Sequence, residues 1–377
     1  MDGESIKLHK INCIIINLII CIPFAFYWLR IHEFFSSPLS IAIISILLTF
    51  MFLLNFRKIV DRPTLIMLMC SVGMLALNGF LYNGWGCVFT CYNITILSAI
   101  FNNIQFSKSQ LKRFHLLIVV LLFIFLLSLE VKPHYKTYTV TGIDDFKLNL
   151  NGFGLLILAC FFHFFLCICK MDINDIIKAL LYIVSVLCVT YFVIISGSRT
   201  AIITLGVFFV LLLFKNWKMK NYKTILWCFI VFAIILPFLY LGYIELYESV
   251  EFAGKALNTR ELVWKSTWIL IKHFPIMGSG TIFGMTSSSG GTLTDSAHNV
   301  FWGLWKTVGV VPLIVFVYCI CKGKNIGKVT KVNKIEKKMF LACIVISAFE
   351  TVFNDSNLYI FFISLLLTQK EAEEEVK

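Results

Sequence analysis

Long apolar stretches alternate with short polar ones along almost the whole chain. Twelve stretches approach the roughly 17–25 residues that a helix needs to cross a bilayer. They cover residues 11–29, 38–55, 63–81, 86–101, 114–130, 152–169, 176–196, 200–214, 224–243, 300–321, 339–353 and 355–368. The pattern predicts an all-α fold: a polytopic transmembrane helical bundle of about 12 spans, forming one integral membrane domain over residues 1–377. The last two stretches are short enough to form one re-entrant hairpin instead.

Two polar segments on the same side of the predicted bundle are longer than a tight turn. Residues 131–151 form a polar loop, and residues 244–299 form a large extracytoplasmic loop that we expect to contain short helices. Asn258 and Glu261 have the spacing of a capping box, and Pro275 marks the end of the helix that follows. Trp264 and Trp268 fall on one face of that helix. We expect this face to lie at the membrane interface or to pack on its own loop.

The distribution of positive charge orients the spans. With the N-terminus inside, the inner segments hold 23 of the 33 Lys and Arg residues and the outer segments hold nine. This asymmetry follows the positive-inside rule. Twelve spans then place both termini in the cytoplasm. The first apolar run lacks a small-residue cleavage site, so we interpret it as a retained span and not as a signal peptide.

Composition agrees with a membrane protein and excludes other classes. Apolar residues make up 59% of the chain, charged residues 14%, and mean hydropathy is +0.86. The net charge of +12 is divided among short segments, so no continuous basic face or nucleic-acid motif results. The 13 cysteines lie mostly within apolar runs and lack zinc spacing. We therefore expect no metal, no cofactor and no nucleic-acid partner.

Arg199 is the first candidate for chemistry, because ionisable residues at membrane spans are costly and usually functional. It lies in the turn Ser196-Gly197-Ser198-Arg199-Thr200 between two spans. Backbone amides, the hydroxyls of Ser196 and Ser198 and the guanidinium would together suit an anion. The alternative is a flanking arginine that reaches the membrane surface.

Arg260 and His298 are the candidates within the large loop. Arg260 stands near the start of the predicted loop helix, where its charge adds to the positive end of the helix. It could instead be a solvated arginine paired with Glu261. If Asp295 or Ser296 caps the tenth span, His298 lies in its first turn, and the helix dipole keeps its ring neutral and able to accept a proton. An interfacial histidine without a role is the alternative.

Three further residues within or near spans have less specific interpretations. Lys306 falls within the tenth span, and Glu350, near the outer end of the eleventh, is a second base or a partner of a cation. His163, in the middle of the sixth span, is interpreted as a packed and satisfied histidine. Gly278-Ser279-Gly280-Thr281 resembles a phosphate loop but follows no predicted strand, so it fails as a dinucleotide motif.

The order of these motifs resembles the O-antigen ligase/polymerase superfamily over about residues 150–315. The motifs are Asn151-Gly152-Phe153-Gly154, Ser196-Gly197-Ser198-Arg199, Arg260 with Trp264, Gly278-Ser279-Gly280, and His298-Asn299 followed by Gly309. The resemblance implies a metal-independent, inverting glycosyltransferase that uses polyprenyl-diphosphate-linked glycans. It also implies that Arg199 and Arg260 bind the diphosphate and that His298 activates the acceptor hydroxyl, with Asn151, Ser196, Ser198, Lys306 and Glu350 as candidate substrate-binding residues.

The sequence thus favours a repeat-unit polymerase for capsular, O-antigen or exopolysaccharide in the bacterial cytoplasmic (inner) membrane. Its partners would be lipid-linked oligosaccharide donor and acceptor, membrane lipids, and flippase and chain-length regulator proteins. An O-antigen ligase or protein O-oligosaccharyltransferase would keep the chemistry and change the acceptor. A transporter or lipid-glycan flippase would require charged residues along mid-membrane helices, whereas the candidates here cluster on the outer side.

Overall fold

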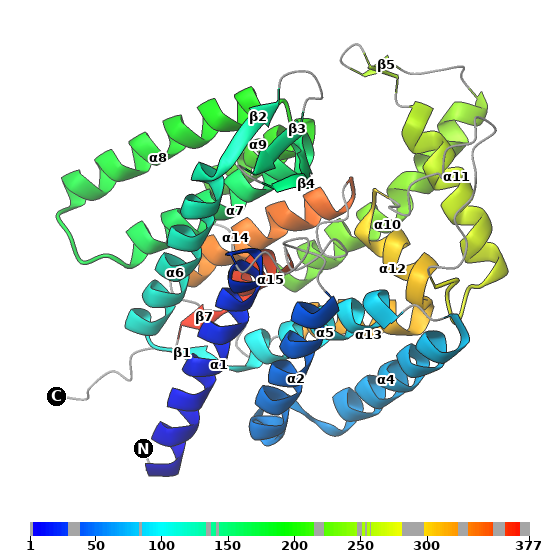
Figure 1. The fold of residues 1–377 in the computed structure, drawn as a ribbon, viewed down its shortest axis with the longest axis horizontal. Coiled ribbons are helices and arrows are strands. Elements are labelled where there is room, and N and C mark those ends of the chain that lie inside the picture. The colour runs from blue at the N-terminus through cyan, green and yellow to red at the C-terminus, as the bar shows by residue number, and fades with distance from the viewer. Residues whose placement is uncertain are drawn as a thin grey trace.

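The computed structural model is a bundle of helices (Figure 1). It describes residues 3–28, 38–82, 85–132, 137–140, 143–214, 222–246, 251–252, 255–256, 258–280, 298–322, 331–349 and 359–369. Within these ranges, seven helices are long and apolar enough to cross a membrane. Three shorter apolar helices cover Leu39–Leu54, Arg199–Leu213 and Val310–Cys321. The predicted helical membrane fold is confirmed, while the count of 12 spans stays a prediction.

The first nine predicted spans correspond to helices with similar bounds. A helix is expected there because it pairs every backbone group of a single segment within lipid. These helices are α1 Gly3–Trp28, α2 Pro38–Leu54, α4 Arg62–Tyr82, α5 Trp85–Asn103, α6 Lys108–Leu127, α7 Leu150–Lys170, α8 Asp175–Ser196, α9 Arg199–Leu213 and α10 Tyr222–Leu246. The short helix α3, Phe56–Ile59, joins α2 to α4.

The predicted tenth span is wrong as a single helix. Residues 300–321 form two helices, α12 Val300–Val308 and α13 Val310–Cys321, separated by Gly309. Gly309 has a φ of 89°, and a Cβ there would lie 1.9 Å from the carbonyl oxygen of Ile276. The amide of Val310 donates to the Pro275 carbonyl at 3.2 Å. The segment around Ile276, within the predicted large loop, therefore packs against the junction between the two helices, and only glycine leaves room for it.

The described residues contain further elements besides these helices. They are α11 Asn258–His273, α14 Lys331–Ser347, α15 Tyr359–Ile363, the 3-10 turn η3 Ser364–Leu366, and seven short strands. The predicted polar loop 131–151 contains most of an antiparallel sheet with order β2-β3-β4, from Leu129–Lys132, Thr137–Val140 and Ile143–Asn149. The other strands form two pairs, β1 Gln105–Phe106 with β7 Thr368–Gln369 and β5 Glu251–Phe252 with β6 Lys255–Ala256.

Helices α5 and α7 form the centre of the bundle. In each of them, 72% of the apolar stretch that could span the membrane is buried inside the protein. The share is 22% for α8, which lies at one edge of the bundle (Figure 1). Polar residues on α5 bind neighbouring backbone; the amide of Asn102 donates to the Cys319 and Ile320 carbonyls at 2.8 and 3.0 Å. These carbonyls belong to the last turn of α13, where no intrahelical donor exists. Asn102 on α5 therefore holds the C-terminal end of α13, whose carbonyl groups would otherwise lack hydrogen-bond donors.

Polar contacts between connecting segments agree with the predicted topology. His9 bonds to Gln110 at 2.6 Å. Asp61 pairs with Lys322, and Lys108 pairs with Asp172. Hydrogen bonds from Lys322, then from Thr64, hold the pKa of Asp61 well below its usual range. Each of these contacts joins two segments that the charge rule assigns to the cytoplasm, so the assignment is geometrically consistent.

A chain of buried polar side chains connects α6, α7, α14 and the 359–366 segment. Lys170 pairs with Glu336, both almost fully buried. His115 bonds to His163 between their Nδ1 atoms at 2.9 Å, and Nε2 of His163 lies 2.8 Å from the Phe361 carbonyl oxygen. Because a carbonyl only accepts, His163 carries its proton on Nε2, and with neutral rings His115 donates from Nδ1. His163 is a packed and satisfied histidine, as predicted.

Separating the Lys170–Glu336 pair should strongly destabilise the bundle. We expect Lys170→Met to lower the unfolding free energy by about 3–5 kcal/mol, because Glu336 would remain buried without its partner. The double variant Lys170→Met/Glu336→Leu should recover most of that loss, because it removes both charges. Unfolding in detergent micelles measures the effect. A single variant as stable as the wild type would contradict this role for the pair.

Candidate active site

The turn that carries Arg199 is built by consecutive helix caps. Helix α8 ends at Gly197, whose left-handed φ is 64°, and Ser198 caps the start of α9. Ser196 Oγ accepts from the Ser198 amide at 3.2 Å, and Ser198 Oγ accepts from the Ala201 amide at 3.2 Å. Both hydroxyls thus shape the turn. Arg199 follows as the first residue of α9, where its side chain is exposed.

Helix α7 meets this turn at its first residues. Ser198 Oγ donates to Asn151 Oδ1 at 3.3 Å. A Cβ on Gly154 would lie 2.6 Å from Ser198 Cβ and 2.9 Å from Ala201 Cβ, so glycine permits the close approach of α7 to α9. The structure therefore brings Asn151, from one sequence motif, together with Ser196, Ser198 and Arg199, from another.

The loop helix occurs where the sequence predicts it, but its tryptophan face is covered by protein. α11 runs from Asn258 to His273, two residues before Pro275. Trp264 stacks edge-on against Tyr240 at 5.2 Å, and Trp268 packs against Phe238 at 4.7 Å. The face that we expected at the membrane interface or on its own loop instead joins α11 to α10 and α12. Arg260 is the third residue of α11, and its side chain lies outside the described residues.

A proline in α10 provides the attachment point for the start of α12. Pro237 has no N–H, so the Ala233 carbonyl one turn earlier lacks its helical donor. Asn299 donates to that carbonyl at 2.8 Å and to the Ala348 carbonyl at 3.1 Å. Trp302 Nε1 donates to the Ile234 carbonyl at 2.9 Å. The start of α12 therefore lies against the middle of α10, and Asn299 joins α10, α12 and the end of α14.

His298 is held directly before this attachment point. Its φ is 45°, and it is the one non-glycine residue with positive φ in the described part of the chain. Such a conformation costs on the order of 1–3 kcal/mol and persists only where the surroundings impose it. Asn299 caps α12 by accepting from the Trp302 amide at 3.0 Å. The cap of α12 is therefore Asn299 and not Asp295 or Ser296, and His298 precedes the helix instead of lying in its first turn.

The glycine-rich segment 278–280 has a structural role at the junction of α12 and α13. The Ser279 amide donates to the Lys306 carbonyl at 2.6 Å, and the Gly280 amide donates to the Thr307 carbonyl at 3.0 Å. Asn78 on α4 donates to the carbonyls of Met277 and Thr307. The segment is therefore fastened to the α12–α13 junction, in agreement with its failure as a phosphate loop. Sequence reasoning missed Asn78 and Pro237; the proline within an apolar span was the available signal for the second.

The predicted site residues fall into three groups. Asn151, Ser196, Ser198 and Arg199 lie together where α7, α8 and α9 meet. His298 and the buried Lys306 belong to α12 and the residues before it. The side chain of Arg260 and all of Glu350 lie outside the described residues, so a common site for Arg199, Arg260 and His298 stays a prediction. Among the described residues, no group of three or more His, Cys, Asp and Glu side chains could hold a metal ion.

The coupling between Pro237 and Asn299 can be measured as a double-mutant cycle. Asn299→Ala should destabilise the protein by about 1–3 kcal/mol, because buried backbone groups lose their partners. Pro237→Ala restores a helical donor for the Ala233 carbonyl, so Asn299→Ala should cost less in that background. Unfolding of the four proteins in detergent gives the coupling energy. Strict additivity would contradict the proposed attachment.

Comparison with known proteins identifies the central part of the chain. Residues 184–317, from the middle of α8 to α13, match a family model described as O-Antigen ligase. No match was found among curated proteins or among solved structures. The matched segment contains Arg199, Arg260, His298 and Lys306, whereas Asn151 and Glu350 lie beyond it. The match confirms the resemblance seen in the motifs: residues 184–317 are similar to the O-antigen ligase family.

Proposed function

We propose that the protein is a repeat-unit polymerase for capsular, O-antigen or exopolysaccharide, an inverting glycosyltransferase that joins polyprenyl-diphosphate-linked oligosaccharides at the outer face of the inner membrane. The observation that carries the proposal is His298, which is held in a left-handed conformation within the segment that matches the superfamily. Imposed backbone strain of this kind is concentrated at functional sites.

In the proposed reaction, a hydroxyl of the acceptor glycan attacks the anomeric carbon of the donor. His298 accepts the hydroxyl proton, the new glycosidic bond forms, and the bond from the anomeric carbon to the diphosphate oxygen breaks. The polyprenyl diphosphate leaves with the bonding electrons, and attack from the opposite side inverts the anomeric centre. General-base help of this kind contributes typically ~10²–10⁴-fold.

Arg199 supports the departure of the diphosphate. Its guanidinium is exposed at the first residue of α9, where the helix dipole is positive, so both act on an anion in the same direction. Arg260, near the start of α11, would add a second positive charge. Asn151 and the serines position the Arg199 turn, and Lys306 and Glu350 complete the proposed set of substrate-binding residues. This chemistry needs no metal or other cofactor.

The polymerase interpretation also specifies surroundings and partners. Both termini would be cytoplasmic, and a flippase and a chain-length regulator would act beside the enzyme. A ligase of the same superfamily would use the same donor and groups but transfer the glycan to lipid A core or to a protein. The superfamily match favours either enzyme over a transporter.

Substitution tests the two central side chains. His298→Ala should reduce polymer synthesis by about 10²–10⁴-fold, and Arg199→Ala should reduce it more than Arg199→Lys, which keeps the charge but loses the two-pronged donor. His273→Ala and Arg113→Ala, at exposed residues of the same types, are the matched controls. Polymer length and amount are measured at equal protein levels. Full-length polymer from either alanine variant would refute the mechanism.

The acceptor is tested with purified protein in lipid vesicles. A polymerase supplied only with lipid-linked repeat units should produce a ladder of longer lipid-linked glycans. A ligase would produce no ladder until lipid A core or an acceptor protein is added. Movement of the lipid-linked glycan across the vesicle membrane without new glycosidic bonds would instead indicate a flippase.

A further inference from the structure

An apolar groove lies between α6, α7 and α8. It encloses about 510 Å³, and its lining is almost entirely hydrocarbon, with phenylalanines from all three helices and three small residues, Cys160, Ser185 and Cys188. Helix α8 lies at the edge of the bundle (Figure 1) and only 22% of its apolar stretch is buried, so we expect this side of the groove to face the bilayer. A hydrocarbon chain could therefore enter it directly from the membrane.

The groove lining includes residues that are close in sequence to those forming the Arg199 turn. Phe153 in the lining stands two residues after Asn151, which accepts the Ser198 hydroxyl. Phe192, also in the lining, lies one helical turn before Ser196. From there the groove continues toward the middle of α7 and α8, past Phe164 and Val184. An arginine at the positive end of α9 thus stands above an apolar channel, an arrangement that matches an anionic head group joined to one hydrocarbon chain.

We propose that this groove holds the polyisoprenoid chain of the lipid-linked substrate whose diphosphate binds Arg199. The inference rests on the proposed function and adds a binding site for the lipid part of the substrate. Bilayer lipid is as apolar as the groove, so transfer of the chain into it brings little hydrophobic gain. The contribution of the groove is orientation: a chain fixed below the turn holds its diphosphate at Arg199.

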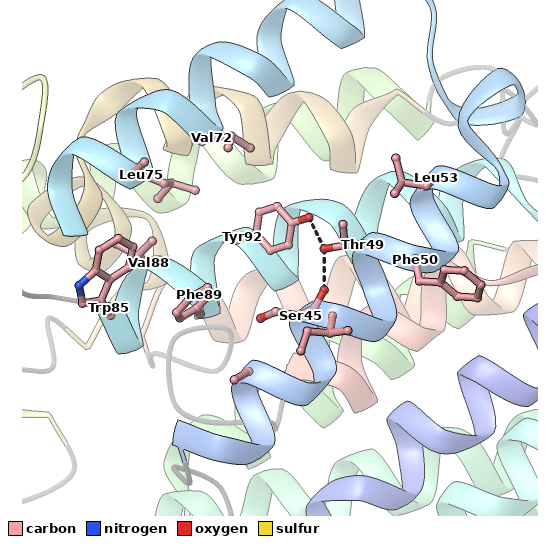
Figure 2. Close-up of a pocket in the computed structure, with 13 residues that line it drawn as sticks. Ser45, Thr49, Phe50, Leu53, Val72, Leu75, Trp85, Val88, Phe89 and Tyr92 are labelled. Atoms are coloured by element: carbon pink, nitrogen blue, oxygen red, sulfur yellow. Dashed lines mark hydrogen bonds between the residues drawn. The ribbon is translucent and has the colours of Figure 1, made fainter. Parts of the chain in front are cut away.

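A second groove serves as a comparison within the same molecule. It lies between α2, α4 and α5, encloses about 590 Å³ and is also apolar (Figure 2). Its main polar feature is a hydrogen bond of 2.7 Å between Thr49 and Tyr92. Its lining comes from helices that do not contribute to the Arg199 turn, and it contains three small residues, Ala42, Ser45 and Ala76. The two grooves thus resemble each other in size and polarity and differ in what lies at their ends.

Filling each groove separately tests the proposal. Cys160→Phe/Cys188→Phe should raise KM for the long-chain polyprenyl substrate by about tenfold, with little change in kcat and no change in KM for an analogue on a short prenyl chain. Ala42→Phe/Ala76→Phe, in the second groove, should leave all three values unchanged. An equal effect of both pairs, or an equal rise in KM for the short-chain analogue, would overturn the proposal. Unchanged kinetics in the Cys160/Cys188 variant would overturn it as well.

Direct labelling separates this proposal from the proposed function. A photoreactive polyprenyl diphosphate without sugar should label peptides of α7 and α8 in the wild type and lose most of that labelling in Cys160→Phe/Cys188→Phe. Excess unlabelled polyprenyl diphosphate should compete, and phosphatidylglycerol should not. Equal competition by phosphatidylglycerol would overturn the proposal, because the groove would then take ordinary phospholipid. Labelling that follows this pattern in a protein that makes no polymer would refute the polymerase function and keep the groove.

Discussion

The candidate site depends on one missing hydrogen-bond donor. Pro237 cannot donate to the Ala233 carbonyl, and an unpaired carbonyl inside a membrane protein is costly. Asn299 supplies the donor, and in doing so connects α12 to the middle of α10 and to the end of α14. His298 is the residue immediately before that connection, so the hydrogen bonds of Asn299 restrict where it lies. The hydrogen-bond donor that α10 lacks at Pro237 therefore helps to determine where the proposed catalytic base lies.

The same rule organises the rest of the bundle. Asn102 satisfies the terminal carbonyls of α13, and Asn78 satisfies the carbonyls of Met277 and Thr307 at the α12–α13 junction. Side-chain amides fill positions where a helix ends or breaks, because lipid offers no water as an alternative. In the buried Lys170–Glu336 pair, each charged side chain likewise compensates the charge of the other. Specific polar contacts thus hold parts of the bundle in addition to apolar packing.

Much of the fold could be predicted from the sequence because membrane helices are governed by two simple properties, apolar length and charge bias. The first nine spans agree closely with helices, and contacts such as Asp61–Lys322 agree with the predicted sides. The break at Gly309 was not predicted. It depends on the approach of Ile276, which is distant in sequence and leaves no mark on the hydropathy of residues 300–321.

The candidate site was predictable in its parts and not in its arrangement. Motifs indicated Asn151, Ser198 and Arg199, but the contact between Asn151 and Ser198 comes from the folded structure. The cap at Asn299 was not predicted either, because Asp295, Ser296 and Asn299 are equally good capping residues. The hydrogen bonds of Asn299 to α10 and α14 decide the matter, and they exist only in the folded bundle.

The central claim is that Arg199 and His298 act on one lipid-linked diphosphate substrate. An experimental structure with a bound polyprenyl-diphosphate-linked glycan tests it most directly. The account predicts diphosphate oxygens within about 3 Å of the Arg199 guanidinium, with the His298 ring facing the anomeric carbon on the side opposite the diphosphate. A diphosphate bound at the cytoplasmic ends of the helices, or away from both side chains, would contradict it.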